Sequence, residues 1–243
     1  MNLFEESLLL LAREQGIALE LIRVNLAQRN LLPCLGCRAC FDRGEDACPR
    51  KDDLLQLKRE LLEADGYLIA SPVYVEDVNG VMKTMIDRLA FFSHRPALYG
   101  KAALLYVTSG IGSSNHALNT MRTAFGTWGV RVVNGLKFRL GALTPEEEIR
   151  ARYGASISRA AASLLAVLRQ QPFRPSFYSL LAFSVQQSMW RRDANAKNAF
   201  DLQYWQQSGW LDHGRRYYDP ALARGPRAVV AYLLGKLIAL FFG

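Results

Sequence analysis

Apolar and polar positions alternate along the first 140 residues with two different spacings. In some segments the apolar residues recur every three to four positions, as on one side of a helix; others are short apolar runs typical of strands. The segments follow as helix 3–15, strand 17–24, loop 25–51, helix 54–64, strand 66–70, loop 71–79, helix 80–92, strand 101–107, helix 115–128 and strand 130–133. This order predicts an α/β fold, with a doubly wound parallel sheet covered by helices on both faces.

The rest of the chain has the spacing of helices. Pro145 followed by Glu146 and Glu147 is typical of a helix start, and this helix is expected to run to about residue 170. A proline-flanked stretch at 171–176 predicts a boundary between a first domain, 1–171, and a helical basic extension, 172–243. Within the extension we expect three helices, over 177–190, 200–207 and 226–242.

Composition and charge narrow the class of protein. Half of the 243 residues are hydrophobic, which is enough for a buried core and excludes general disorder. Residues 151–243 carry the whole net charge of +8, with 12 Lys and Arg against 4 Asp and Glu, whereas residues 1–150 hold 18 of each. These cations are scattered and mostly Arg, so we expect no nucleic acid partner. Two explanations of the basic charge stay open: contact with an anionic membrane surface, and a face that is only exposed to solvent. The opening residues lack the basic region of a signal peptide, so we expect a cytoplasmic protein.

All four cysteines fall within fifteen residues, in the loop 34–48. In a chain without export signals, clustered thiols more often hold a metal or do redox chemistry than form disulfides. Structural zinc sites usually separate two Cys pairs by a dozen or more residues, whereas three cysteines at two-residue gaps can surround a cubane cluster. The spacing of Cys34, Cys37, Cys40 and Cys48 therefore favours a [4Fe–4S] cluster, with zinc and free thiols as the open alternatives.

Two loops that follow predicted strands have unusual chemistry. In an open α/β sheet, ligands bind beyond the carboxyl ends of the strands. One loop offers Pro72 and the flat ring of Tyr74, and the other, 108–112, offers backbone N–H groups beside small side chains. A planar heterocycle with hydrogen-bonding edges suits the space between them. The chain has three histidines and no G-x-S-x-G motif; His94 is interpreted as capping or solvent-facing, and no general acid or base is assigned.

Taken as a set, these residues resemble the NAD(P)H-dependent FMN reductases, in particular the iron–sulfur flavoprotein branch with a flavodoxin-like fold. The resemblance covers most of residues 1–140. Its motifs are Cys34-x2-Cys37-x2-Cys40, Cys48 ahead of Asp52 and Asp53, Ser71-Pro72-Val73-Tyr74, and Gly80-x2-Lys83-x3-Asp87-Arg88.

The resemblance implies an FMN whose ring lies against Ser71, Pro72, Val73 and Tyr74, with Ser109, Gly110 and Ile111 at its pyrimidine edge. It implies that the four cysteines hold a [4Fe–4S] cluster, and that NAD(P)H or a small donor supplies electrons that pass to a small-molecule or protein acceptor. It also implies a homo-oligomer. We interpret Lys83, Asp87 and Arg88 as helix surface and ion pairing, with Asp87 paired to Lys83 one turn earlier.

The sequence departs from the family at its start. Members begin with a strand and a phosphate-binding loop ahead of the first helix, and this sequence begins inside that helix. In the flavodoxin-like strand order the absent strand is central, so strand 17–24 would lose its neighbour. We expect that the DNA upstream of Met1 encodes this strand and loop. The alternative is a non-catalytic remnant that has lost FMN and serves in assembly or membrane contact.

The closing segment, 226–243, is apolar on every side, with Arg227 and Lys236 as its only charges. A helix that is apolar on every side must be buried against other parts of the protein, a partner or a membrane. It is slightly short for a membrane span, and Lys236 near its middle would be costly in hydrocarbon. We expect it to pack onto the first domain or a partner subunit; the alternative is peripheral contact with a membrane interface.

Overall fold

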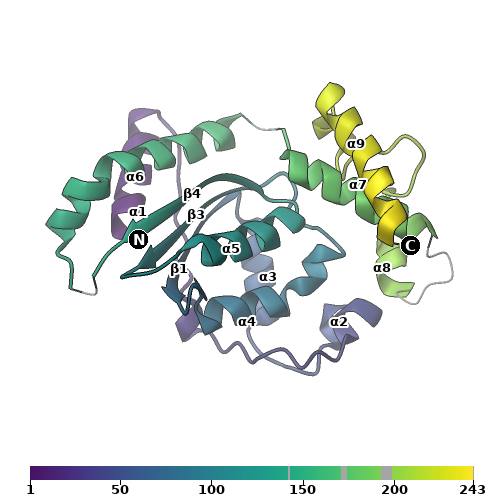
Figure 1. Ribbon diagram of the computed structural model, residues 1–243, viewed down its shortest axis with the longest axis horizontal. Helices are drawn as coiled ribbons and strands as arrows, with labels where there is room; N and C mark the ends of the chain where they lie inside the picture. Colours follow the sequence, from purple (N-terminus) through teal and green to yellow (C-terminus); the bar gives the residue numbers. More distant parts are fainter. Residues whose placement is uncertain (142, 171–173, 193–198, 243) are drawn as a thin grey trace.

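Three parallel strands and one short antiparallel strand form the centre of the computed structural model, which describes residues 1–141, 143–170, 174–192 and 199–242 (Figure 1). The sheet order is β2-β1-β3-β4. β1 is parallel to β3, and β3 is parallel to β4, whereas β2 is antiparallel to β1. The strands are β1 (Gly66–Tyr74), β2 (Asp77–Val78), β3 (Ala102–Ser109) and β4 (Arg131–Arg139).

Helices cover both faces of this sheet, as the alternation of elements predicts. On one face lie α1 (Asn2–Glu14) and α6 (Glu146–Arg169), and on the other α3 (Leu54–Glu63), α4 (Gly80–Arg88) and α5 (Asn115–Thr127) (Figure 1). β3 runs between the two layers with every residue buried except Thr108. The doubly wound α/β fold is confirmed, and the sheet positions the strand ends that the sequence marks as ligand-binding.

The predicted strand 17–24 is wrong. The segment is extended, but in the described part of the chain no backbone–backbone hydrogen bond involves residues 18–24. A strand forms only when a neighbouring strand takes up its N–H and C=O groups, and no described strand lies beside this one. Leu21 and Ile22 consequently remain exposed. Among the described residues, the edge of β1 that faces away from β3 pairs only with β2, at Val73 and Tyr74.

Three other predicted bounds need correction. β1 does not stop at Ala70 but continues to Tyr74 and turns back into β2, so much of the predicted loop 71–79 is a hairpin. The predicted helix 80–92 ends at Arg88 and is followed by a 3-10 turn, Ala90–Ser93. β4 runs to Arg139 rather than to residue 133, because its pairing with β3 resumes at Asn134 after an irregularity at Val133.

The extension consists of helices with a core of their own. They are α7 (Phe177–Arg192), α8 (Ala199–Gln207) and α9 (Pro226–Ala239), followed by a 3-10 turn, Leu240–Phe242. The core is aromatic and is built on Phe183, Trp205, Trp210, Tyr217 and Tyr218. The helices lie together at one end of the sheet (Figure 1). The predicted boundary between residues 171 and 172 lies outside the described residues.

The predicted loop 25–51 is irregular apart from one short helix and two 3-10 turns. These are α2 (Ala39–Asp42) and the turns Leu26–Gln28 and Glu45–Ala47. A further 3-10 turn, Pro220–Leu222, precedes α9. Within the described residues, no helix combines the length and the hydropathy that a membrane crossing requires.

Candidate functional site

The carboxyl ends of β1 and β3 lie side by side at one edge of the sheet. In their parallel register Ser71 is opposite Val107 and Pro72 is opposite Thr108. The register therefore brings the two predicted ligand segments together, Ser71, Pro72, Val73 and Tyr74 from β1 with Ser109, Gly110 and Ile111 from the end of β3. This is the edge at which open α/β sheets bind ligands.

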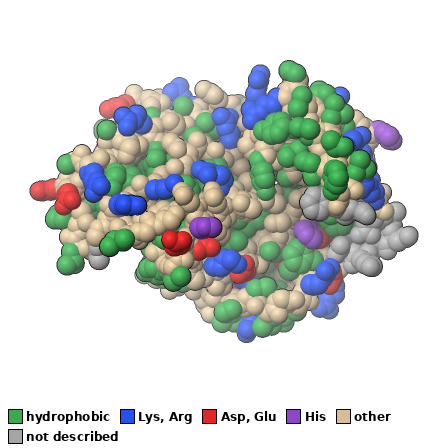
Figure 2. Space-filling model, in the orientation of Figure 1, with side chains coloured by type: hydrophobic (Ala, Val, Ile, Leu, Met, Phe, Trp, Pro, Cys, Tyr) green, Lys and Arg blue, Asp and Glu red, His purple; other side chains and the backbone are tan. Residues whose placement is uncertain are grey.

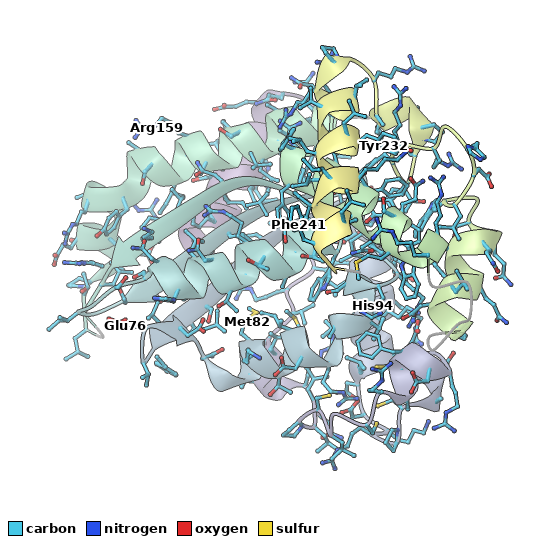
Figure 3. The ribbon with its side chains drawn as sticks, turned by 45° about the vertical axis from the view of Figure 1, so that its right-hand side comes forward. Glu76, Met82, His94, Arg159, Tyr232 and Phe241 are labelled. Carbon is cyan, nitrogen blue, oxygen red and sulfur yellow. The ribbon has the colours of Figure 1, made fainter. Side chains whose placement is uncertain are left out.

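Backbone strain and one buried hydroxyl fix the first segment. The Ser71 Oγ accepts a hydrogen bond from the N–H of Asn79 at 3.2 Å and so ties the start of α4 to β1. At the tip of the hairpin Val75 and Glu76 both have positive φ, 50° and 64°, in a two-residue turn between Tyr74 and Asp77. Figure 3 labels Glu76 at this tip. Positive φ is unfavourable for a β-branched valine, and such strain tends to be kept at ligand sites.

The second segment offers unpaired donors. The hydroxyls of Ser109 and Ser114 lie 2.9 Å apart and hold the two ends of the loop together. Between them, the backbone N–H groups of Gly110, Ile111 and Gly112 bond to no residue in the described part of the chain. Ile111 is fully exposed, as is Val75 on the hairpin. The loop thus presents N–H donors and apolar side chains together, which matches a planar heterocycle with a polar edge.

A basic groove adjoins this loop and was not predicted from the sequence. Its volume is about 520 Å³, and its lining comes from the start of α5, the end of β4 and the first half of α6. Among the described residues that line it, three are cations and none is a carboxylate; they are Gly112, Ser113, Ser114, Asn115, Lys137, Arg139, Arg152 and Tyr153. The Lys137 ammonium donates to Asn115, and the Arg152 guanidinium lies 5.2 Å from the centre of the Tyr153 ring. The groove is therefore suited to an anionic ligand.

All four cysteines line one cavity of about 80 Å³, beneath α4 and beside α2. None of them forms a disulfide. Burial raises the pKa of the Cys40 thiol, and so do the neighbouring Cys34 and Cys48, against the opposing effect of Arg95. Among the described residues no three His, Cys, Asp or Glu side chains converge as a single metal ion requires.

Arg88, at the end of α4, lines this cavity and is not a surface residue. The sequence-based interpretation as helix surface is wrong for Arg88, which is buried with Asp52. The guanidinium pairs with the Asp52 carboxylate, donates to the Leu32 carbonyl at 2.6 Å and lies 3.7 Å from the Cys48 Sγ. The predicted pair between Lys83 and Asp87 is confirmed.

The burial of Asp52 would raise the pKa of its carboxyl, but hydrogen bonds reverse the shift. The donors are the Arg88 guanidinium and the N–H groups of Leu32 and Leu54, and together they lower the pKa below its ordinary value. Asp52 therefore stays ionised and holds the start of the cysteine loop against α3 and α4.

The extension reaches the cysteine cavity through a second buried ion pair. Arg95 pairs with Asp201 of α8 and with Glu45, and it donates to the Cys40 carbonyl at 2.9 Å. His94 caps the 3-10 turn Ala90–Ser93 and leaves 41% of its side chain exposed, as the interpretation of His94 as capping or solvent-facing expects. Its Nδ1 also lies 2.7 Å from Asp201, a contact that the sequence did not predict. Figure 3 shows His94 where the extension meets the cysteine loop. Residues more than 100 positions apart thus meet beside the thiols.

The fold and the paired loops define a flavodoxin-like α/β protein with a ligand edge. Residues 4–144 match the family described as NADPH-dependent FMN reductase. Because this match covers more than half of the chain, the chain belongs to that family.

The curated relatives that the chain resembles are iron–sulfur flavoproteins. One from Archaeoglobus fulgidus is 36% identical over 112 residues, which are 46% of this chain and 50% of that protein. One from Methanocaldococcus jannaschii is 40% identical over 75 residues, 31% of this chain and 37% of that protein. The chain thus spans half or less of these relatives' own length.

Two solved structures show the same fold. The crystal structure of RosB with a bound 8-demethyl-8-formylriboflavin-5'-phosphate intermediate matches 70% of this chain and 74% of its own, with a TM-score of 0.53 at 18% identity. A flavone reductase matches 70% of this chain and 58% of its own, with a TM-score of 0.53 at 14% identity. At these identities the likeness concerns the architecture alone.

Proposed function

We propose that this protein is an FMN-dependent oxidoreductase that takes electrons from NAD(P)H and passes them to a small-molecule or protein acceptor. The observation that carries the proposal is the meeting of Ser71–Tyr74 and Ser109–Ile111 at the carboxyl edge of the sheet, in a chain of the FMN reductase family. Bound FMN supplies the hydride and electron chemistry, so the protein needs no general acid or base of its own.

In this proposal the two loops bind and orient the flavin. The ring of Tyr74 and the side chain of Ile111, both exposed, cover apolar surface of the ligand. The free N–H groups of Gly110 and Ile111 donate to its polar edge. Ser71 acts through the backbone, because its hydroxyl holds the hairpin that carries Tyr74.

The basic groove takes the phosphates of the nicotinamide nucleotide. It begins at Gly112, directly after the loop assigned to the flavin, so a dinucleotide bound there can reach the ring. Lys137, Arg139 and Arg152 neutralise the phosphate charge, and none of the described lining residues is a carboxylate that would oppose it.

In this proposal the cysteine cavity holds a [4Fe–4S] cluster; the relatives are named iron–sulfur flavoproteins, and the cluster type is inferred from the cysteine spacing. Zinc draws its four thiolates to about 2.3 Å from one point, whereas a cubane spreads them over four irons. The observation that supports a cluster here is that all four thiols line one cavity. α4 leads from the flavin loops to this cavity; at ~1.5 Å per residue its nine residues span about 13 Å.

Spectroscopy of the purified chain tests the proposal. After anaerobic reconstitution with FMN, iron and sulfide, we expect bound FMN, a broad absorption near ~400 nm and oxidation of NADPH. Cys37→Ser should remove the broad absorption and leave FMN binding unchanged. A chain that takes up no FMN under these conditions would contradict the oxidoreductase proposal, and a Cys37→Ser variant with the same spectrum would contradict the cluster.

A further inference from the structure

Helix α9 is packed with its small residues inward and its large apolar residues outward. Its buried side is made of Ala228, Ala231, Gly235 and Ala239, which face α7. The residues on its opposite side and in the turn that follows are large, apolar and between 41% and 84% exposed. They are Val230, Leu233, Leu234, Leu237, Leu240 and Phe241. Figure 2 shows the resulting hydrophobic surface over α9. A helix of a water-soluble domain normally has the reverse arrangement.

Close contact with α7 fixes this orientation. A Cβ added at Gly235 would lie 2.4 Å from the Cβ of Ser184, so only glycine fits where the two helices cross. The Ser184 hydroxyl donates to the Tyr232 carbonyl at 2.7 Å. Small residues at every fourth position, here Ala231, Gly235 and Ala239, are typical of helix pairs in membranes. Rotation of α9 would drive leucines into this contact, so the apolar side stays outward.

The charged side chains of α7 and α9 have one sign. Neither α7 nor α9 contains an Asp or Glu, whereas the two helices carry Arg191, Arg192, Arg227 and Lys236. Arg192 donates to the Ala239 carbonyl, and Lys236 lies 4.5 Å from the centre of the Tyr232 ring. Neither contact neutralises the positive charge. The surface thus combines a large apolar area with a basic surround.

We infer that this face of α9 docks onto a lipid bilayer with anionic headgroups. Apolar residues enter the boundary between headgroups and acyl chains, while the basic residues meet the negative surface. α9 has 14 residues, about 21 Å at ~1.5 Å each, which is short of the ~30 Å hydrocarbon core, so the helix lies along the membrane rather than across it.

A second copy of the chain is a poorer occupant of this face. In a two-fold dimer the same patch meets itself, which would gather the cations of both copies at the rim. Neither α7 nor α9 supplies a carboxylate to balance them. An anionic bilayer satisfies both the apolar area and the charge.

Vesicle co-sedimentation of the full chain tests this inference. We expect binding to vesicles of phosphatidylcholine with about one third phosphatidylglycerol, at least about tenfold weaker binding to pure phosphatidylcholine, and weakening with salt. Leu233→Glu with Leu237→Glu should reduce binding about tenfold or more. Leu10→Glu on α1 is the matched control, because Leu10 and Leu233 are both 59% exposed, and it should bind as the parent does.

Three outcomes would overturn the inference: no binding of the parent chain to anionic vesicles, equal binding to neutral ones, or equal loss in Leu10→Glu. If light scattering instead shows a dimer that only the α9 variant converts to monomers, with vesicle binding unchanged, the face is a subunit interface. Circular dichroism verifies that both variants are folded. Oxidation of NADPH in solution should be the same in all three proteins, so the outcome is separate from that for the proposed function.

Discussion

Tyr74 and Lys83 provide a matched pair of residues for testing the flavin site. Both are largely solvent-exposed, but Tyr74 ends β1 at the ligand edge, whereas Lys83 pairs with Asp87 on the outer side of α4. If the Tyr74 ring lies against FMN, Tyr74→Ala removes about 1.5–3 kcal/mol of apolar contact. We expect FMN to bind roughly tenfold to a hundredfold more weakly in this variant.

Fluorescence titration with FMN measures this effect, and Lys83→Ala is the control. That variant loses an exposed i,i+4 ion pair worth about 0.3–0.5 kcal/mol of helix stability, and its FMN affinity should not change. Equal affinities of the two variants would remove Tyr74 from the site.

Asp52 and Arg88 form the buried pair on which the shape of the cysteine loop depends. Asp52→Asn leaves the Arg88 guanidinium buried without its counter-charge, which should lower the free energy of unfolding by about 3–5 kcal/mol. Urea denaturation measures the loss of stability. The control is Asp87→Asn, on the exposed side of α4, which also carries Arg88; this variant should lose less than about 1 kcal/mol.

The same carboxyl gives a pH dependence with a definite sign. The folded pKa of Asp52 lies below its ordinary value, so the unfolded chain takes up this proton first as the pH falls. The contribution of Asp52 is fully present above its ordinary pKa and is lost as the pH falls through the folded value. The parent chain should therefore lose more stability below about pH 4 than Asp52→Asn does. Parallel losses in the two proteins would contradict this assignment.

Among single residues, the sequence predicts local relationships and misses distant ones. The pair of Lys83 with Asp87 follows from helical spacing, and the grouping of the four cysteines follows from their closeness in the chain. The burial of Arg88 and the contact of His94 with Asp201 depend on partners 36 and 107 positions away. Spacing along the chain contains no information about such pairs.

Among elements, periodicity predicts helices more reliably than strands. A helix satisfies its own backbone, so the pattern over 3–15 is sufficient to predict α1. A strand needs a neighbour: residues 17–24 have the apolar content of a strand and no described strand beside them, whereas β4 continues through Asn134 and Gly135 because β3 pairs with it. The basic groove was missed for a similar reason, since its three cations come from β4 and α6 and meet only in the folded chain.

Arg139 tests the proposal that this groove binds the nucleotide donor. Arg139→Glu reverses one of three charges, and we expect KM for NADPH to rise about tenfold with kcat nearly unchanged, because binding rather than chemistry is weakened. Steady-state kinetics at low salt measure the change. Arg159→Glu is the control, because Arg159 is also an exposed arginine, lies on α6 and is not among the residues that line the groove (Figure 3). A fall in kcat at unchanged KM would place Arg139 elsewhere in the mechanism.

At the scale of the whole molecule, Arg95 joins the extension to the cysteine loop. Its guanidinium contacts Asp201 of α8, Glu45 beside the cavity and the Cys40 carbonyl, and the Phe200 ring lies 4.9 Å from it. Tyr99 of the first domain packs against the aromatic core of the extension, in ring contact with Trp210 and Tyr218. Beside the cysteine loop, the ionic contacts of Arg95 connect the two parts. Order in the cysteine loop should therefore depend on a residue in the extension.

Asp201→Asn tests this dependence. Among the described residues, the substitution leaves Arg95 with Glu45 as its counter-charge in a buried site. We expect the free energy of unfolding to fall by about 3 kcal/mol, the lower end for a broken buried pair. Hydrogen exchange should speed up in both α8 and the loop 34–48, because local opening is set by the contacts that hold a segment. Asp219→Asn, which changes an exposed cap elsewhere in the extension, should leave exchange in the loop unchanged. If Asp201→Asn speeds exchange in α8 alone, the cysteine loop is held by Asp52 and Arg88 without help from the extension.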